Sequence, residues 1–132
     1  MNVVFALLAD SANVSLEGKL NILGSFANIH ANTFPVRHPA MQLVIRMEAS
    51  SVEAGRSKKL EVLLVGPDGA KIGGFEADFD VPPAPQAGER INMQLIMSMV
   101  DTVLPAAGKY AVHVLIDGNE GFVVPISVEE LK

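Results

Sequence analysis

Apolar and polar side chains alternate with a period of two along most of the chain, and this alternation predicts strands rather than helices. The clearest segment is 41–48, where the odd-numbered positions are all apolar and the even-numbered ones are mostly polar. Residues 3–9 are apolar throughout, which is typical of a strand buried on both faces. Further segments of this kind occupy 19–30, 58–65, 70–80, 90–99, 109–117 and 121–128. No stretch keeps a helical spacing.

Turn-forming residues separate these segments. The tetrapeptide Gly-Pro-Asp-Gly at 66–69 predicts a tight turn, because Pro presets φ, Asp bonds to nearby backbone and Gly accepts a left-handed conformation. The Asp-Gly-Asn sequence at 117–119 is a strong hairpin signal. The proline-rich stretch 81–88 predicts a stiff connection between sheets. Pro125 lies inside the last segment, which we therefore expect at an edge or a bulge.

About eight short strands separated by Gly and Pro predict an all-β fold, either a sandwich or a barrel, and we expect a two-sheet antiparallel β-sandwich. We expect residues 1–132 to form a single domain, because this length leaves no room for a second core. Leu104, Gly108 and Tyr110 favour an immunoglobulin-like sandwich, in which such a Tyr bonds back to nearby backbone and closes a corner. The alternative for Tyr110 is an amphipathic residue at a strand end.

Composition and charge narrow the classes of function. The chain lacks Cys, which excludes disulfides and thiolate metal sites and favours a cytoplasmic location. The net charge is −5, and the only basic cluster is Arg56, Lys58 and Lys59, so we expect no nucleic acid as a partner. The apolar run 3–9 is too short for a membrane span. Because no Lys or Arg precedes Lys19, we interpret this run as a first strand rather than a signal peptide.

Hydrophobic residues make up 49% of the chain, and several stand at nominally outward positions of the predicted strands. These positions are Leu23, Val44, Leu63, Val65, Ile96 and Leu115. An apolar surface outside the core is typical of an interface, and an exposed sheet edge can add a strand from a partner. We therefore expect a homo-oligomer, a dimer or larger, or the binding of another protein.

Histidines are the main candidates for chemistry. His30 and His38 flank the loop 31–37, so they can approach one another across it. A zinc site needs three or four ligands, and neither Asp10 nor Glu48 stands at a ligand spacing, so we predict no metal and no cofactor. A hydrolase is the least favoured alternative, because it requires either histidine within bonding distance of one of these carboxylates. No nucleophile-elbow or nucleotide-binding motif occurs, and we predict that the protein is not an enzyme.

Three stretches of sequence resemble those of a family of small bacterial proteins with no assigned function. They are Phe-Ala-Leu-Leu-Ala-Asp at 5–10, Gly-Lys-Leu-Asn-Ile-Leu-Gly-Ser-Phe at 18–26 and Phe-Pro-x-x-His at 34–38. The resemblance covers mainly residues 3–48, with a weaker similarity in the hairpin 108–118. It implies that the chain is one complete unit, and it carries over no catalytic residues because none are established for that family.

These observations predict a non-catalytic protein-interaction or self-associating module. The candidate interaction or ligand surface consists of Asp10, His30, Arg37, His38, Leu63 and Val65. The alternative is a sandwich that binds a small ligand or a carbohydrate. It ranks lower, because sugar sites commonly use aromatic platforms and the chain has no Trp and one Tyr.

Overall fold

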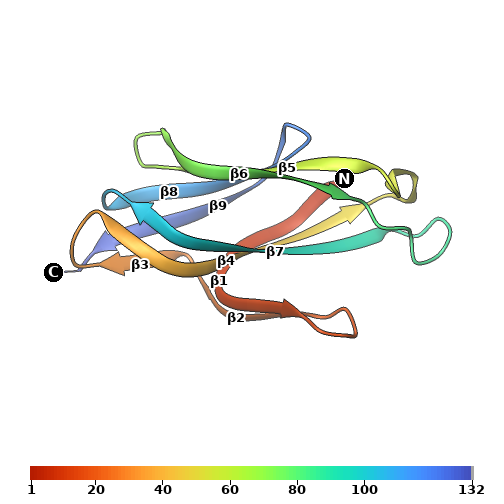
Figure 1. Cartoon of the computed structure of the whole chain (residues 1–132), viewed down its shortest axis with the longest axis horizontal. Coiled ribbons are helices and arrows are strands. Elements are labelled where there is room, and N and C mark those ends of the chain that lie inside the picture. Colours follow the sequence, from red (N-terminus) through yellow and green to blue (C-terminus); the bar gives the residue numbers. More distant parts are fainter. Residues whose placement is uncertain (132) are drawn as a thin grey trace.

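The computed structural model describes residues 1–131, and these residues form nine strands (Figure 1). The strands are β1 (Asn2–Val14), β2 (Leu20–Phe26), β3 (Asn28–Ala31), β4 (Val36–Ala49), β5 (Ser57–Val65), β6 (Lys71–Asp80), β7 (Ile91–Leu104), β8 (Gly108–Ile116) and β9 (Asn119–Glu130). One short 3-10 helix, η1 (Ser51–Glu53), connects β4 to β5. In the part of the chain that the structure describes, no helix has the length and hydropathy of a membrane span.

The strands form two sheets that lie one over the other (Figure 1). The first has four strands in the order β2-β1-β4-β7, all antiparallel. The second has five strands in the order β3-β9-β8-β5-β6. The predicted all-β fold with two sheets is therefore confirmed. The prediction that both sheets are purely antiparallel is wrong, because β3 pairs with β9 in parallel, with Asn28 opposite Ser127.

The parallel pair results from a crossover that the sequence pattern does not reveal. The alternation predicts one strand over 19–30, but the chain leaves the four-stranded sheet after Phe26 and enters the five-stranded sheet at Asn28. This division adds a strand to the predicted number. Phe26 and Ile29 both pack against the core although they belong to different sheets, so hydrophobicity alone does not mark the change of sheet.

The core lies between the two sheets. Met41, Leu43, Ile45 and Met47 of β4 are fully buried, as their alternation predicts. The five-stranded sheet contributes Ile29, Leu60, Val62, Leu64, Tyr110, Val112, Val114, Ile116, Val124, Ile126 and Val128 to the same cluster. Full burial of one such aliphatic side chain contributes roughly 1.5–3 kcal/mol, so this interior layer is the main source of stability.

The turns follow the sequence predictions. Asp117 and Gly118 both have positive φ, 50° and 81°, which is the geometry of a two-residue hairpin loop. In the turn at 66–69, the Gly69 N–H donates to the Gly66 carbonyl at 3.0 Å. Residues 81–88 form the predicted connection between sheets, since they join β6 of one sheet to β7 of the other without strand structure.

Tyr110, near the start of β8, holds the turn that precedes its strand. Its hydroxyl donates to the Ala106 carbonyl at 2.6 Å and accepts from the Ala106 N–H at 3.2 Å. The side chain is buried in the core. The predicted bond from this Tyr back to nearby backbone is therefore confirmed.

Pro125 lies in β9, which is an interior strand in the order of its sheet, whereas the sequence predicts an edge or a bulge at this position. The short strand β3 pairs only with residues 127–130. Residue 125 therefore has a strand neighbour on one side only, where it lies opposite Ala111 of β8. A residue without an N–H fits such a position, because no ladder bond is needed on the open side.

Candidate functional site

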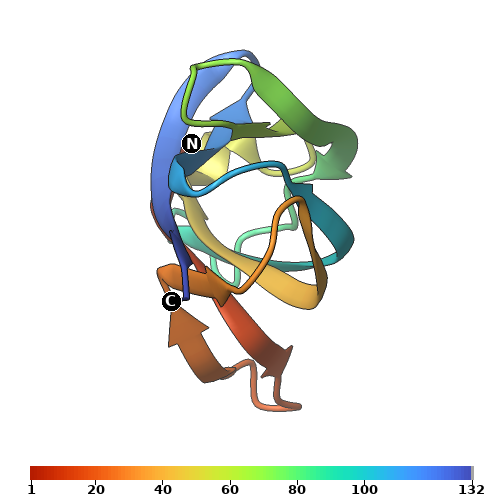
Figure 2. The ribbon, with the colours of Figure 1, turned by 90° about the vertical axis from the view of Figure 1, so that its left-hand side faces the viewer.

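The hairpin of β1 and β2 extends beyond the sandwich (Figure 2). β4 pairs with β1 only as far as Ala9, which lies opposite Gln42, so residues 11–23 form a two-stranded arm. The exposed apolar side chains of this arm are Val14, Leu16, Ile22 and Leu23. A two-stranded hairpin is at best marginally stable in water. The arm therefore presents apolar area that the fold does not use for its own core.

A row of apolar residues crosses the outer face of the four-stranded sheet. Leu7 of β1, Val44 of β4 and Ile96 of β7 are directly paired neighbours, so they lie on the same face of the sheet. Val44 is fully buried but does not belong to the core cluster, because its neighbours on the outer face cover it. We call these three residues the apolar row. The outward positions that the sequence predicts for Val44 and Ile96 are confirmed.

Two of the candidate residues lie on the other sheet. Leu63 and Val65 are half-buried on β5, where Leu63 pairs with His113 and Val65 with Ala111 of β8. His113 contacts the carboxylate of Glu120 through its Nδ1 atom. Leu63 and Val65 therefore belong to a separate patch, and the predicted single surface of six residues does not form.

Three other candidates meet in one pocket. Asp10, His30 and His38 line a hollow of about 450 Å³ where the chain crosses from β2 to β3. The remaining lining residues are Gly24, Ser25, Phe26, Asn28 and Ile29. Arg37 is exposed, pairs with Val103 of β7 and does not line this pocket, because successive residues of a strand point to opposite sides.

Within residues 1–131, no hydrogen bond or ion pair joins His30 or His38 to Asp10 or Glu48. The rings of His38 and Phe26 pack with centroids 5.9 Å apart, and the buried Nε2 atom of His38 has no hydrogen-bond partner within residues 1–131. His30 Nδ1 lies 3.7 Å from Glu129 Oε2, and Glu48 instead accepts from Arg90. Among the described residues, no group of three His, Cys, Asp or Glu side chains is placed to hold a metal ion.

A second hollow lies between β6 and β7, which are edge strands of different sheets. It has a volume of about 460 Å³ and a mostly apolar lining that includes Leu64, Ile72, Phe75 and Met99. The sequence pattern does not reveal this hollow, because its walls come from segments that are distant along the chain. A local signal for it is the alternation of apolar residues at odd positions of β7, one of which, Met99, lines the hollow.

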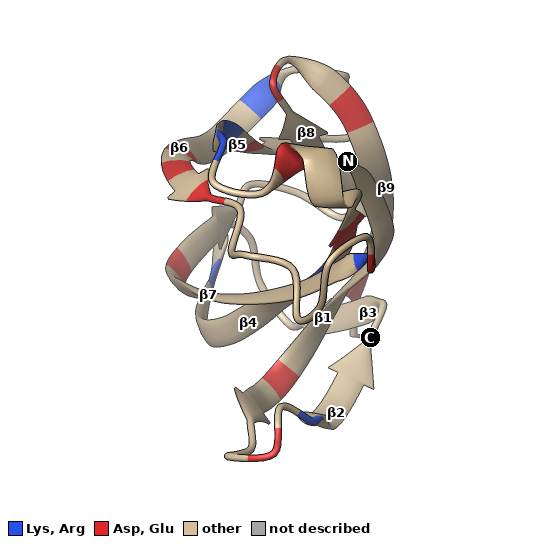
Figure 3. Cartoon of the chain, turned by 90° about the vertical axis from the view of Figure 1, so that its right-hand side faces the viewer, with Lys and Arg blue, Asp and Glu red and all other residues tan. Residues whose placement is uncertain are grey.

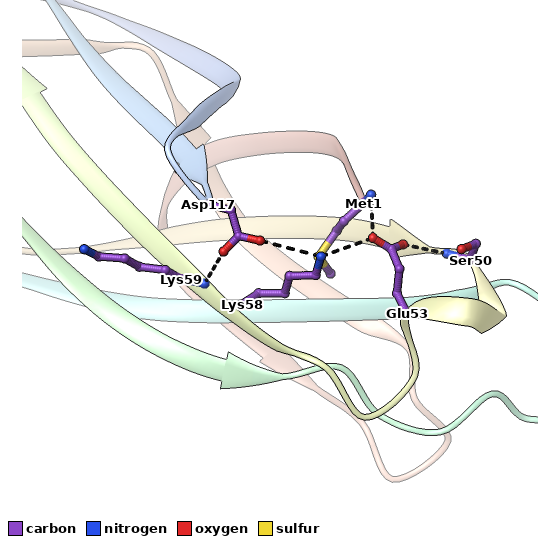
Figure 4. A network of polar contacts seen from close by, with 6 residues as sticks. All are labelled: Met1, Ser50, Glu53, Lys58, Lys59 and Asp117. Atoms are coloured by element: carbon purple, nitrogen blue, oxygen red, sulfur yellow. Dashed lines mark hydrogen bonds and ion pairs between the residues drawn. The ribbon is translucent and has the colours of Figure 1, made fainter.

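A network of charges surrounds Glu53 of η1 (Figure 4). Glu53 Oε1 lies 3.0 Å from the Met1 ammonium nitrogen and 3.3 Å from Lys58 Nζ, and Oε2 accepts from the Ser50 N–H at 3.0 Å. These contacts, with the Met1 ammonium group as the largest cause, lower the pKa of Glu53 from 4.5 to about 2. Lys58 also lies 3.6 Å from Asp117 Oδ2. The network ties β1, η1, β5 and the β8–β9 hairpin together.

The comparisons with known proteins place the chain in a family without giving it a function. A search of the curated proteins finds no significant match. Residues 4–129 match DUF6941, a family of unknown function, which agrees with the resemblance of the sequence to an uncharacterised family. Because the match extends over nearly the whole sequence, the chain belongs to the DUF6941 family.

Proposed function

We propose that the protein is a non-catalytic interaction module with an immunoglobulin-like fold, and that it self-associates through apolar surface on its four-stranded sheet. The observation that carries this proposal is the apolar surface outside the core. Two residues of the apolar row, Leu7 and Ile96, are only partly buried on the outer face, and the arm adds exposed side chains such as Leu16 and Leu23. A cytoplasmic location and the lack of enzymatic activity stay predictions.

Strand order supports the immunoglobulin-like part of the proposal. β1, β4 and β7 are neighbours in one sheet, as strands A, B and E are in an immunoglobulin-type sandwich. β5, β8 and β9 are neighbours in the other, as strands C, F and G are. Tyr110 stands near the start of β8, the counterpart of strand F, and bonds back to the preceding turn. The arm is an addition to this plan.

The exposed apolar side chains supply a driving force for association. Leu23 is 73% exposed, and Leu16 at the tip of the arm is fully exposed. Burying one Leu side chain contributes roughly 1.5–3 kcal/mol. Covering several of them against a partner therefore contributes enough to offset part of the entropy that association costs.

Light scattering tests the proposal directly. We expect the wild type to be a dimer or larger at micromolar concentration. Val100 of β7 is an exposed apolar residue of the same sheet, and the double variant Leu23→Ser with Val100→Ser should dissociate at a higher protein concentration than the wild type does. Val52→Ser is the matched control, because Val52 is 73% exposed but lies on η1 rather than on the four-stranded sheet. A wild type that is monomeric at micromolar concentration would contradict the proposal.

A second candidate function, the binding of a small apolar ligand, is favoured by the hollow between β6 and β7. Its volume of about 460 Å³ lies in the range of ligand pockets, roughly 300–1,000 Å³. Titration of the folded protein with the fluorophore 1-anilinonaphthalene-8-sulfonate near neutral pH tests whether this hollow binds an apolar ligand. Binding that Met99→Lys abolishes and Val52→Lys retains would support this function, whereas the absence of binding to the wild type would exclude it for this probe.

A further inference from the structure

We propose that two copies of the chain join edge to edge through β7, about a two-fold axis at Ile96, so that their four-stranded sheets become one continuous sheet. This inference rests on the proposed function, because it names the partner as a second copy and the contact as an edge strand. Three sets of observations carry it: the state of each sheet edge, the position of charges along β7, and the side chains that the pairing covers.

Three of the edge strands have features that resist the addition of a further strand. β3 has only four residues. β6 carries Glu76, Asp78 and Asp80 (Figure 3), and acids on this edge would face the same acids of a second copy. β2 is interrupted by Gly24, whose φ is +71°. Short, charged or irregular edges are the usual protection against pairing between chains.

β7 is the remaining edge, and its first ten residues lack such protection. The run 91–100 contains no charged residue and no proline. Its pairing with β4 continues from Ala49 opposite Ile91 to Val36 opposite Leu104 without a register shift. The open side of β7 therefore presents a long, regular row of backbone donors and acceptors, which is a template for another strand.

Charge and symmetry select the register. We consider an antiparallel pair of β7 strands related by a two-fold axis perpendicular to the sheet. Residues opposite one another then share a face of the sheet, so the axis lies between the two copies of one residue. With the axis at Ile96, residue 92 meets residue 100 of the second copy and every pair between them is uncharged. An axis at Leu95 pairs Ile96 with Gln94 of the second copy, which interrupts the apolar row. It also brings Asp101 towards Glu89, which lies just before β7, and like charges that approach in this way are destabilising. An axis at Met97 shortens the uncharged overlap to 94–100.

This register also joins apolar side chains on both faces. On the outer face Ile96 meets its own copy, so the apolar row of one chain continues into that of the other. On the inner face Leu95 meets Met97, and Met93 meets Met99. All four of these residues are only partly buried in one copy. Thioether side chains adapt readily to such contacts, so the pairing covers apolar area that a single copy leaves open.

Cysteine cross-linking tests the register, because the chain contains no cysteine. Directly opposite residues of antiparallel strands have Cα atoms roughly 4.5–5.5 Å apart, which lies within the range for disulfides. We expect Ile96→Cys to form covalent dimers on mild oxidation. We expect a mixture of Leu95→Cys and Met97→Cys to cross-link as well, and the control Val52→Cys not to. Packing of two outer faces would not join residues 95 and 97, so the mixture identifies edge pairing.

A charge exchange at the two-fold position gives an independent test. Ile96→Lys or Ile96→Glu alone should raise the dissociation constant of the dimer at least about tenfold, because like charges then oppose one another. An equimolar mixture of the two variants should restore the dimer, since residue 96 meets its own copy. Circular dichroism shows whether each variant folds. If the charged variants do not fold, the cysteine variants still test the register.

The outcomes separate this inference from the proposed function. If the wild type is a dimer, but Ile96→Cys does not cross-link and Ile96→Lys leaves the mass unchanged, edge pairing through β7 is wrong and self-association stands. If the wild type is a monomer at micromolar concentration, the proposed self-association and the edge pairing through β7 are both wrong.

Discussion

Glu53 provides a direct test of how charge contributes to the stability of this fold. The Met1 ammonium group, the Ser50 N–H and Lys58 stabilise its carboxylate and lower its pKa from 4.5 to about 2. Because the pKa in the folded state lies below that of the unfolded chain, the carboxylate stabilises the fold above about pH 4.5. This contribution is lost progressively as the pH falls through the folded pKa of about 2.

The size of the effect follows from the shift and from exposure to solvent. The full shift corresponds to about 3.4 kcal/mol at roughly 1.36 kcal/mol for each pKa unit. The Glu53 side chain is 13% exposed, and solvent near the surface screens its partners. We therefore expect Glu53→Gln to lower the free energy of unfolding by about 1–2 kcal/mol at pH 7.

Urea unfolding followed by circular dichroism between pH 7 and pH 2.5 measures this difference, on protein with a free Met1 amino group. The difference in the free energy of unfolding between wild type and Glu53→Gln should narrow as the pH falls, with part of it left at pH 2.5, because that pH still lies above the folded pKa of about 2. Glu17→Gln is the control, because Glu17 forms an exposed pair with Lys19 and should not change the pH profile. Identical pH profiles for wild type and Glu53→Gln would refute the reasoning.

Three further predictions test individual features of the fold. Tyr110→Phe removes both hydrogen bonds to the turn before β8 and should lower the free energy of unfolding by about 1–3 kcal/mol. An unchanged midpoint of the urea unfolding transition would contradict this prediction. In Gly24→Ala the new Cβ lies 2.5 Å from Asp10 Oδ2, and the residue has a positive φ. In the control Gly18→Ala the new Cβ meets open space, so only the conformational cost of about 1–2 kcal/mol applies. Gly24→Ala should therefore lower the free energy of unfolding more than Gly18→Ala does. Replacing Asp10 by Ala should reduce that difference, as thermal melting would show, because only the Asp10 Cβ, 3.2 Å from the new Cβ, then remains in close contact. Replacing 12–22 of the arm by Asn-Gly should change the free energy of unfolding by less than about 1 kcal/mol, because these residues lie outside the core; a larger loss in urea would show that the arm supports the sandwich.

Much of the strand structure and two of the turns were predictable from the sequence. The alternation over 41–48 identified which side chains of β4 enter the core, because successive residues of any strand point to opposite faces. The turns at 66–69 and 117–118 were predictable for another reason. Pro, Asp and Gly carry their φ preferences and local hydrogen bonds with them, whatever the rest of the chain does.

The candidate site was predictable only in part. Asp10, His30 and His38 do line one pocket, but they meet because the chain changes sheets between Phe26 and Asn28. No local pattern contains that event. Leu63 and Val65 are apolar and outward, as expected, yet they lie on the other sheet, because hydrophobicity does not say which sheet a strand joins.

The sequence by itself determined the strands, the turns and the apolar character of the outward positions, because side-chain polarity and φ preference act over a few residues. Only the tertiary structure decided that β3 runs parallel to β9, that the arm stands apart from the sandwich, and that β7 lies at an edge. These features depend on pairing between segments far apart in the chain, such as β4 with β7. The absence of charge from 91–100 is visible in the sequence, but it acquires a meaning for association only once the order of the strands is known.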